Sequence, residues 1–357
     1  MINKDRNRNL NIDIMRVICS IFIVIMHIID FYFLNYKQVG NSFWQFINIF
    51  ESSIRFAVPV FFMISGALLI KNLNESIKNF YKKRLLKVVV PYILISIVYS
   101  IGNQIIKTNT VSVNSIVKNI ISFDAHYHLW FFEPLIILYL ITPLIRKLIL
   151  FLEKNNKSII INTYLILWTT FGIIIPTVMN IYNHTSFRYG IQIINYLGYF
   201  ILGYAISNYY KKLFYNREKL VILTYSISVI ITFLGNYFYL NSETGIYNNY
   251  FILPNTLNIY IQAFSIFMYF SIKEVKLNRF NQRIINIIGE SSLYIYLLHP
   301  IFILILKDFL NINLFQGNLY LKCFLSIFIV VILTIVASII TNRLFSYFIK
   351  KLNIYYN

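Results

Sequence analysis

Residues 13–30 read DIMRVICSIFIVIMHIID, an apolar run interrupted by one arginine and one histidine. A helix of about 20 apolar residues is long enough to cross the ~30 Å hydrocarbon core of a bilayer. At about 100° per residue, Arg16 and His27 lie roughly 20° apart around that helix and ~16 Å apart along it. Ionisable side chains inside a membrane usually line a cavity or a pathway. We therefore expect a polar path through the protein along this stripe.

Apolar runs of similar length recur throughout the chain. Of its 357 residues, 58% are hydrophobic and 13% are charged, and the mean hydropathy is +0.65. A soluble domain of this length needs more charge to cover its surface. The sequence predicts an all-α integral membrane protein that forms a single domain (1–357). About ten transmembrane helices are expected, near residues 12–36, 43–70, 85–106, 128–150, 158–179, 190–209, 220–240, 250–272, 284–306 and 320–349.

The distribution of Lys and Arg predicts the topology. When Arg16, Arg55 and Arg343 are set aside, 23 Lys and Arg residues fall on one set of alternate segments, including the span ends that adjoin them, and six on the other. Cytoplasmic loops carry the excess of positive charge, so both termini are expected in the cytoplasm and the number of spans is expected to be even. The net charge of +19 is then explained by topology and attraction to anionic membrane lipids, and no nucleic-acid partner is expected.

The cysteines and the first span indicate which other structural features to expect. Cys19 and Cys323 both fall inside expected spans, so we expect no disulfide framework. The first span has a basic flank but no small-residue cleavage pattern, and it is expected to remain as a signal anchor. No metal is expected. The abundance of Ile, Asn, Lys, Tyr and Phe is typical of an AT-rich bacterial genome.

Further polar residues lie within the expected spans. Counting from the start of the fourth span places Glu133 about 8 Å below the outer boundary. His299 falls in the outer half of the ninth span, where Pro300 is able to kink the helix. His27, Glu133 and His299 thus have overlapping depths.

Other pairs follow from helical spacing. Glu51 and Arg55 are four residues apart and are expected to form an ion pair, most simply a structural one. Arg84 and Lys87 are expected to share a helical face near the level of Arg16, although marking of the cytoplasmic side explains most of that cluster. Each residue of the first stripe also has an ordinary explanation: Arg16 as a snorkelling residue at the interface, and His27 as a polar group bonded to a neighbouring helix.

Six stretches in order resemble the membrane acyltransferase family 3, the O-acyltransferase superfamily of bacterial envelopes. The resemblance covers nearly the whole chain and is carried by the R-x10-H pattern from Arg16 to His27, preceded by Asp13. The other stretches are AVPVFFMISGALLI (57–70), FYKKRLLKVVVPY (80–92), HLWFFEPLIILYLITPLI (128–145), YLGYFILGYAI (196–206) and GESSLYIYLLHPIF (289–302). The expectation is a stand-alone form without the C-terminal hydrolase-like domain of some relatives.

The resemblance implies transfer of an acyl group, commonly acetyl, from cytoplasmic acyl-CoA to a hydroxyl of an envelope saccharide or lipid-linked glycan. It implies a multi-pass protein of the bacterial plasma membrane. Histidine has a pKa suited to a base, so His27 would take the hydroxyl proton, or accept the acyl group itself.

The same reading assigns roles to other residues. Asp30 or Glu133 would orient the imidazole. The groups expected to bind CoA phosphates are Arg16, Arg84 and Lys87, and those expected to line the substrate cavity are Trp130, His299, Ser65 and Arg55. Lys87 stands where the family usually has a second arginine, and it keeps the charge but not the planar fork.

Two other classes of membrane protein could account for some of these features. A flippase for lipid-linked saccharide, or a proton-coupled carrier, would also place His, Arg and Glu inside a bundle. Inverted repeats with paired broken helices would favour a transporter, and the sequence shows no such pattern. A membrane glycosyltransferase or polymerase would call for paired acidic residues or a large extracellular loop, and neither is evident. The sequence leaves open the acyl group, the acceptor, direct transfer or relay through a partner protein, and the oligomeric state.

Overall fold

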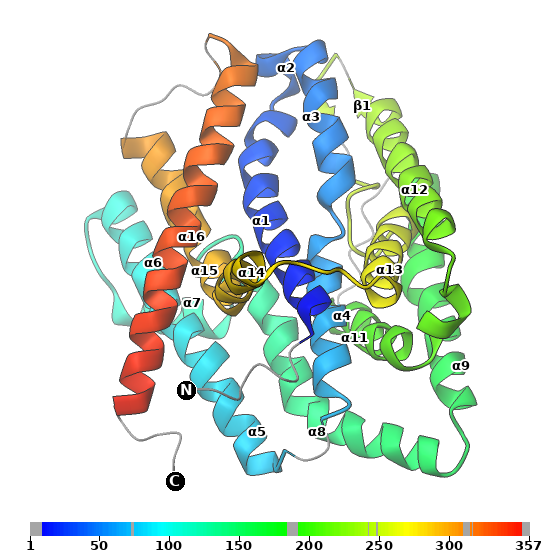
Figure 1. Ribbon diagram of the computed structural model, residues 1–357. Coiled ribbons are helices and arrows are strands. Elements are labelled where there is room, and N and C mark those ends of the chain that lie inside the picture. Colours follow the sequence, from blue (N-terminus) through cyan, green and yellow to red (C-terminus); the bar gives the residue numbers. More distant parts are fainter. Residues whose placement is uncertain are drawn as a thin grey trace.

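The computed structural model describes residues 9–72, 75–183, 192–241, 243–247, 249–309, 315 and 317–351, and these residues are mostly helical (Figure 1). The α-helices are α1 (Leu10–Phe33), α2 (Tyr36–Val39), α3 (Asn41–Ile54), α4 (Ala57–Leu69), α5 (Ile77–Arg84), α6 (Val90–Thr108), α7 (Val113–Ile121), α8 (Phe132–Lys154), α9 (Ile159–Trp168), α10 (Ile175–Asn183), α11 (Gln192–Asn208), α12 (Glu218–Phe238), α13 (Leu257–Ile272), α14 (Arg279–Glu290), α15 (Ser292–Leu304) and α16 (Leu319–Lys351).

Shorter elements join these helices. Three are π-helical turns, η1 (Leu85–Val89), η3 (Thr169–Ile174) and η5 (Ile305–Phe309), and two are 3-10 turns, η2 (Leu129–Phe131) and η4 (Tyr210–Phe214). Strands β1 (Leu240–Asn241) and β2 (Ile246–Tyr247) form a small antiparallel hairpin in which Leu240 pairs with Tyr247.

Among the described residues, seven helical segments are long and apolar enough to cross a membrane, or up to eight if one bent pair is a single span. The seven are Leu10–Phe33, Asn41–Leu69, Ile77–Thr108, Leu129–Lys154, Ile159–Tyr182, Glu218–Phe238 and Leu319–Lys351. The predicted spans at 190–209 and 250–272 correspond to α11 and α13, which have 17 and 16 residues. The protein is therefore an all-α membrane protein, and the count of ten spans stays a prediction.

The main bend of the predicted ninth span does not lie at Pro300, the residue able to kink it. The chain turns by 69° between α14 and α15, at Ser291, whereas α15 continues through Pro300 to Leu304. Proline removes one helical hydrogen bond, and here that loss frees a backbone carbonyl without producing the main bend.

Helix α1 lies at the centre of the bundle. It contacts α3, α4, α13, α14, α15 and α16, and Figure 1 shows it between α16 and α3. Figure 1 also shows α5, the α8–α9 connection and the end of α16 at one end of the molecule, with α2 and the start of α16 at the other. His27 and Asp30 on α1 are thus mostly enclosed by neighbouring helices.

Two glycines allow α4 and α11 to pack backbone against backbone. A Cβ atom on Gly66 would lie 1.7 Å from the carbonyl oxygen of Phe200, and one on Gly203 would lie 2.0 Å from that of Met63. Small residues at such crossings are typical of helix pairs in membranes. This contact fixes α4, and with it the end of α3.

Candidate active site

The site is built on α1, which is continuous and so keeps Arg16 and His27 on one stripe, as predicted. Asp30 lies one turn after His27, and its Oδ2 atom is 3.7 Å from Nδ1 of His27. Only 16% of the His27 side chain and 23% of the Asp30 side chain are exposed. A carboxylate facing Nδ1 favours the tautomer with its proton on that atom, which leaves Nε2 able to accept a proton.

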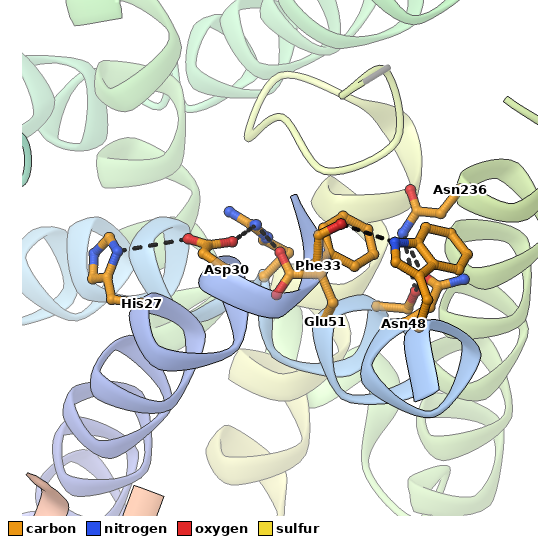
Figure 2. Close-up of polar contacts among 9 residues, drawn as sticks. His27, Asp30, Phe33, Asn48, Glu51 and Asn236 are labelled. Atoms are coloured by element: carbon orange, nitrogen blue, oxygen red, sulfur yellow. Dashed lines mark hydrogen bonds and ion pairs between the residues drawn. The ribbon is translucent and has the colours of Figure 1, made fainter. Parts of the chain in front are cut away.

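Arg55 holds the other oxygen of Asp30. Its Nη2 atom donates to Oδ1 of Asp30 at 2.8 Å and also pairs with the fully buried Glu51. The predicted ion pair of Glu51 with Arg55 is confirmed, and it extends to α1; Figure 2 shows His27, Asp30 and Glu51 in one row. With both carboxylates ionised, the cluster has a net charge of −1 when His27 is neutral. A proton on His27 therefore brings the cluster to neutrality.

Arg55 stands at an interruption between α3 and α4. Arg55 and Phe56 form a turn between the two helices. Pro59 has no N–H to donate to the carbonyl of Arg55, so the regular helical hydrogen bonds are broken here. The break lets the Arg55 side chain reach across to α1.

A second group of polar side chains, termed the amide cluster, joins α3 to α12 and α13. Its members are all buried: Asn48, Ser52, Thr232, Asn236, Asn258 and Gln262. Nδ2 of Asn236 donates to Oδ1 of Asn48 at 2.8 Å (Figure 2). Nε2 of Gln262 donates to the carbonyl of Ser52 at 2.9 Å and to Oγ1 of Thr232 at 3.0 Å. These bonds join α3 to α12 and α13 close to the turn at which α3 ends.

All four histidines in the described part of the chain belong to one group of rings. The His299 ring is stacked on that of His27, with centroids 5.1 Å apart and an interplanar angle of 13°. The His128 ring meets that of His299 edge-on, also with centroids 5.1 Å apart. His126 continues the group, because its Nδ1 atom is 3.0 Å from Nδ1 of His128. Tyr127, which is exposed, meets the His27 ring edge-on.

The sequence fixes the tautomer of His299. Pro300 has no N–H, so the carbonyl of Tyr296 lacks the helical partner that residue 300 would otherwise supply. Nδ1 of His299 lies 2.7 Å from that carbonyl oxygen. A carbonyl can only accept, so Nδ1 carries the proton and Nε2 of the neutral ring is an acceptor. His299 is completely buried, and its Nε2 atom has no hydrogen-bond partner among the described residues.

His126 and His128 were missed by the sequence reading. They flank Tyr127 immediately before the fourth span, a few residues ahead of Glu133, for which a role was predicted. The available signal was the spacing H-x-H at the mouth of a span with a histidine on another span at similar depth. The described residues contain no group of three or more His, Cys, Asp or Glu side chains arranged to hold a metal ion.

The remaining residues predicted for this site lie at its margin. Glu133 is exposed in the first turn of α8, whereas Asp30 provides the carboxylate beside His27. Trp130 is partly buried, with its ring 6.0 Å from that of Tyr196, and Ser65 is partly buried on α4. The roles predicted for these three side chains stay predictions.

The cations predicted to bind CoA are found on α1, at the end of α5 and in η1. Arg16 is 32% exposed and pairs with Asp13 at 3.5 Å. The Arg84 guanidinium stacks over the ring of Phe80, 4.6 Å from its centroid. Lys87 is exposed in η1, a π-helical turn. The α-helical spacing that was expected to put Lys87 on the face of Arg84 therefore does not apply there.

Arg146 also belongs to this end of the molecule and was not predicted as a site residue. It stacks on Phe80, 4.5 Å from the ring centroid, and bonds to the carbonyl of Leu69 at 2.6 Å and to Glu75 at 3.4 Å. Burial raises the pKa of Glu75, but Lys83 and the neighbouring arginines outweigh it and hold that pKa below its usual value. Glu75 is thus ionised and connects α5 with α8.

The fold and site define a multi-pass membrane protein with an imidazole–carboxylate pair inside the bundle. The chain belongs to the acyltransferase family described as "Acyltransferase domain", which matches residues 9–343. It is also similar to the "Probable poly-beta-1,6-N-acetyl-D-glucosamine export protein" of Staphylococcus aureus (strain MRSA252). The two are 23% identical over 315 residues, which cover 85% of this chain and 83% of that protein. No solved structure matches the chain.

Proposed function

We propose that this protein is an O-acyltransferase of a bacterial plasma membrane that moves an acyl group, most simply acetyl, from acyl-CoA to a hydroxyl of a cell-envelope saccharide. Family membership supports the reaction class. The observation that carries the proposal is His27, which faces Asp30 inside the bundle while Arg55 holds that carboxylate. The name of the staphylococcal relative, which includes a polysaccharide, supports the class of acceptor.

In the proposed reaction His27 acts as the base. Its Nε2 atom takes the proton of the acceptor hydroxyl while the oxygen attacks the carbonyl carbon of the thioester. The new C–O bond forms, the C–S bond breaks, and the thiolate of CoA takes the proton back from His27. Asp30 stabilises the imidazolium between these two steps, because protonation of His27 neutralises the net negative charge of the cluster.

The donor is proposed to reach this base from the cytoplasmic side. Arg16, Arg84 and Lys87 would bind the phosphates of CoA, since charge-assisted hydrogen bonds to phosphate are among the strongest in proteins. The excess of Lys and Arg on one set of segments supports a cytoplasmic position for both termini. The acceptor would approach from the opposite side, so that neither substrate crosses the bilayer.

Export of a saccharide is the second candidate, and the printed name of the relative favours it. An exporter must alternate access and carry its whole substrate across the membrane. An acyltransferase needs only a position where donor and acceptor meet.

One experiment separates the two candidates. Proteoliposomes with the protein in a single orientation receive acetyl-CoA on the cytoplasmic side and a soluble oligosaccharide on the other. The proposed function predicts acetylated oligosaccharide on the acceptor side, measured by mass spectrometry. Transport of unmodified oligosaccharide without acylation would contradict it. Comparing the surface polysaccharides of cells with and without the protein identifies the acyl group and the acceptor.

A further inference from the structure

His128 and His299 are both completely buried, and each has an Nε2 atom without a hydrogen-bond partner among the described residues. Leaving a buried polar atom unpaired is costly, so such atoms in a native protein call for an explanation. Their ring centroids are 5.1 Å apart, and the His299 ring is stacked on that of His27. His299 therefore adjoins the base of the proposed reaction, and His128 lies next to His299.

The two nitrogens have complementary hydrogen-bonding roles. His299 has its proton on Nδ1, so its Nε2 atom accepts. His126 and His128 face each other through their Nδ1 atoms at 3.0 Å, and one of the two must donate. Burial, assisted by His27, lowers the pKa of His126 to about 4, so His126 is neutral at pH 7 and the pair shares a single proton between the Nδ1 atoms. When His126 donates, the proton of the neutral His128 ring lies on Nε2.

We propose that His299 and His128 bind a second hydroxyl of the acceptor saccharide, next to the hydroxyl whose proton His27 takes. An alcohol O–H both donates and accepts, so it donates to Nε2 of His299 while its oxygen accepts from Nε2 of His128. This proposal rests on the proposed acyltransferase function and deepens it by locating a hydroxyl of the acceptor beside the one that reacts. Pro300 is a positioning residue in it, because it frees the carbonyl that sets the tautomer of His299.

Water offers the same O–H chemistry, and the two sources predict different products. A site that holds the acceptor alcohol favours transfer to alcohol, whereas a site that holds only water favours hydrolysis of acyl-CoA. The ratio of transfer to hydrolysis therefore distinguishes them, with methyl β-D-glucopyranoside as the alcohol probe and acetyl-CoA as the donor.

The test uses substitutions that alter one ring nitrogen at a time. His299→Asn retains a side-chain donor for the carbonyl of Tyr296 and removes the acceptor at the position of Nε2. His299→Gln places an amide oxygen near that position. We expect His299→Asn to raise the KM for the glucoside by about tenfold, the effect of one lost hydrogen bond, and to lower the transfer-to-hydrolysis ratio. His299→Gln should recover part of both, and CoA affinity should not change in either variant.

The results separate the subsite from the reaction itself. If the normal protein transfers the acetyl group but His299→Asn leaves the KM for the glucoside unchanged, the subsite is wrong and the proposed function stands. If the normal protein transfers nothing, the proposed function fails. The subsite is then tested by 15N-histidine NMR in nanodiscs, where an unchanged His299 Nε2 signal on addition of the glucoside contradicts it. In the same spectra Pro300→Ala should reduce the population of the Nδ1–H tautomer, because residue 300 then competes for the Tyr296 carbonyl.

Discussion

The group around His27 and the amide cluster are both largely buried, and each includes residues of α3, but they differ in chemistry. The first combines Asp30, Glu51 and Arg55 with four imidazoles, so that most of its members are ionisable. The second consists of neutral amides and hydroxyls that bond mostly to one another and to backbone carbonyls. Burial of ionisable groups is expensive in a membrane and is typically retained for function. Neutral hydrogen bonds between helices usually serve packing.

Substitution of His27 is the most direct test of this contrast between the two groups. Replacing His27 by Ala should reduce acyl transfer by about 10²–10⁴-fold, the usual effect of removing an acid–base group, without lowering thermal stability appreciably. The matched variant is Asn48→Ala, which removes a buried polar side chain from the amide cluster and should leave turnover nearly unchanged. Both are measured as acetyl transfer and as unfolding temperature in detergent. Near-normal turnover of His27→Ala would assign His27 to structure.

The next effect concerns the carboxylate that faces His27. Asp30→Asn keeps the size of the side chain but removes the charge that stabilises an imidazolium, so we expect kcat to fall about 10²-fold. The 3.7 Å separation of Asp30 from Nδ1 of His27 is longer than a hydrogen bond, which keeps the expected loss below that of a tightly bonded pair. The control is Glu133→Gln, at the exposed start of α8. A larger loss in the control would make Glu133 the orienting group.

A smaller effect is expected at Arg16, Arg84 and Lys87, where charge should influence CoA binding but not the chemical step. Arg84→Ala should weaken CoA binding by about tenfold and leave kcat unchanged, since arginine forms paired bonds to phosphate. Lys87→Ala should weaken binding less, and Arg16→Ala more than Lys87→Ala. Titration of solubilised variants with CoA measures all three. Equal affinities across the series would remove these residues from the donor site.

The smallest effect is expected in the amide cluster itself. Gln262→Leu removes two hydrogen bonds, and interhelical bonds of this kind contribute about 0.6 kcal/mol on average. We expect a fall of a few degrees or less in unfolding temperature, with acyl transfer retained. Loss of transfer without loss of stability would show that the amide cluster takes part in function, and the contrast between the two groups would no longer hold.

The sequence was informative wherever periodicity or charge alone decides the structure. The length of apolar runs predicted the long helices, helical spacing put Arg16 and His27 on one stripe, and the i, i+4 rule paired Glu51 with Arg55. These relations lie within one helix and need no knowledge of packing.

Contacts between helices could not be predicted in the same way. The bond from Arg55 to Asp30 and the meeting of His128 with His299 depend on which helices adjoin, and the sequence does not specify this. The sequence identified Pro300 as able to kink the ninth span, whereas the main bend occurs at Ser291 and the carbonyl that the proline frees is bonded by His299 of the same helix. Local rules identified the proline but not the side chain that bonds the carbonyl it frees.

The glycine contact between α4 and α11 has a consequence for how the protein is made. Gly66 leaves the ribosome roughly 140 residues before Gly203, which at about 5–20 residues per second is a wait on the order of ten seconds. During that time α4 lies in the membrane with its small-residue face covered by lipid or by the insertion machinery. Because α4 continues the span that carries Arg55, the carboxylates and the arginine are in place early, yet their helix acquires its final packing only when α11 arrives. Asp30, Glu51 and Arg55 are therefore synthesised early, and the helix packing that fixes their positions is completed late.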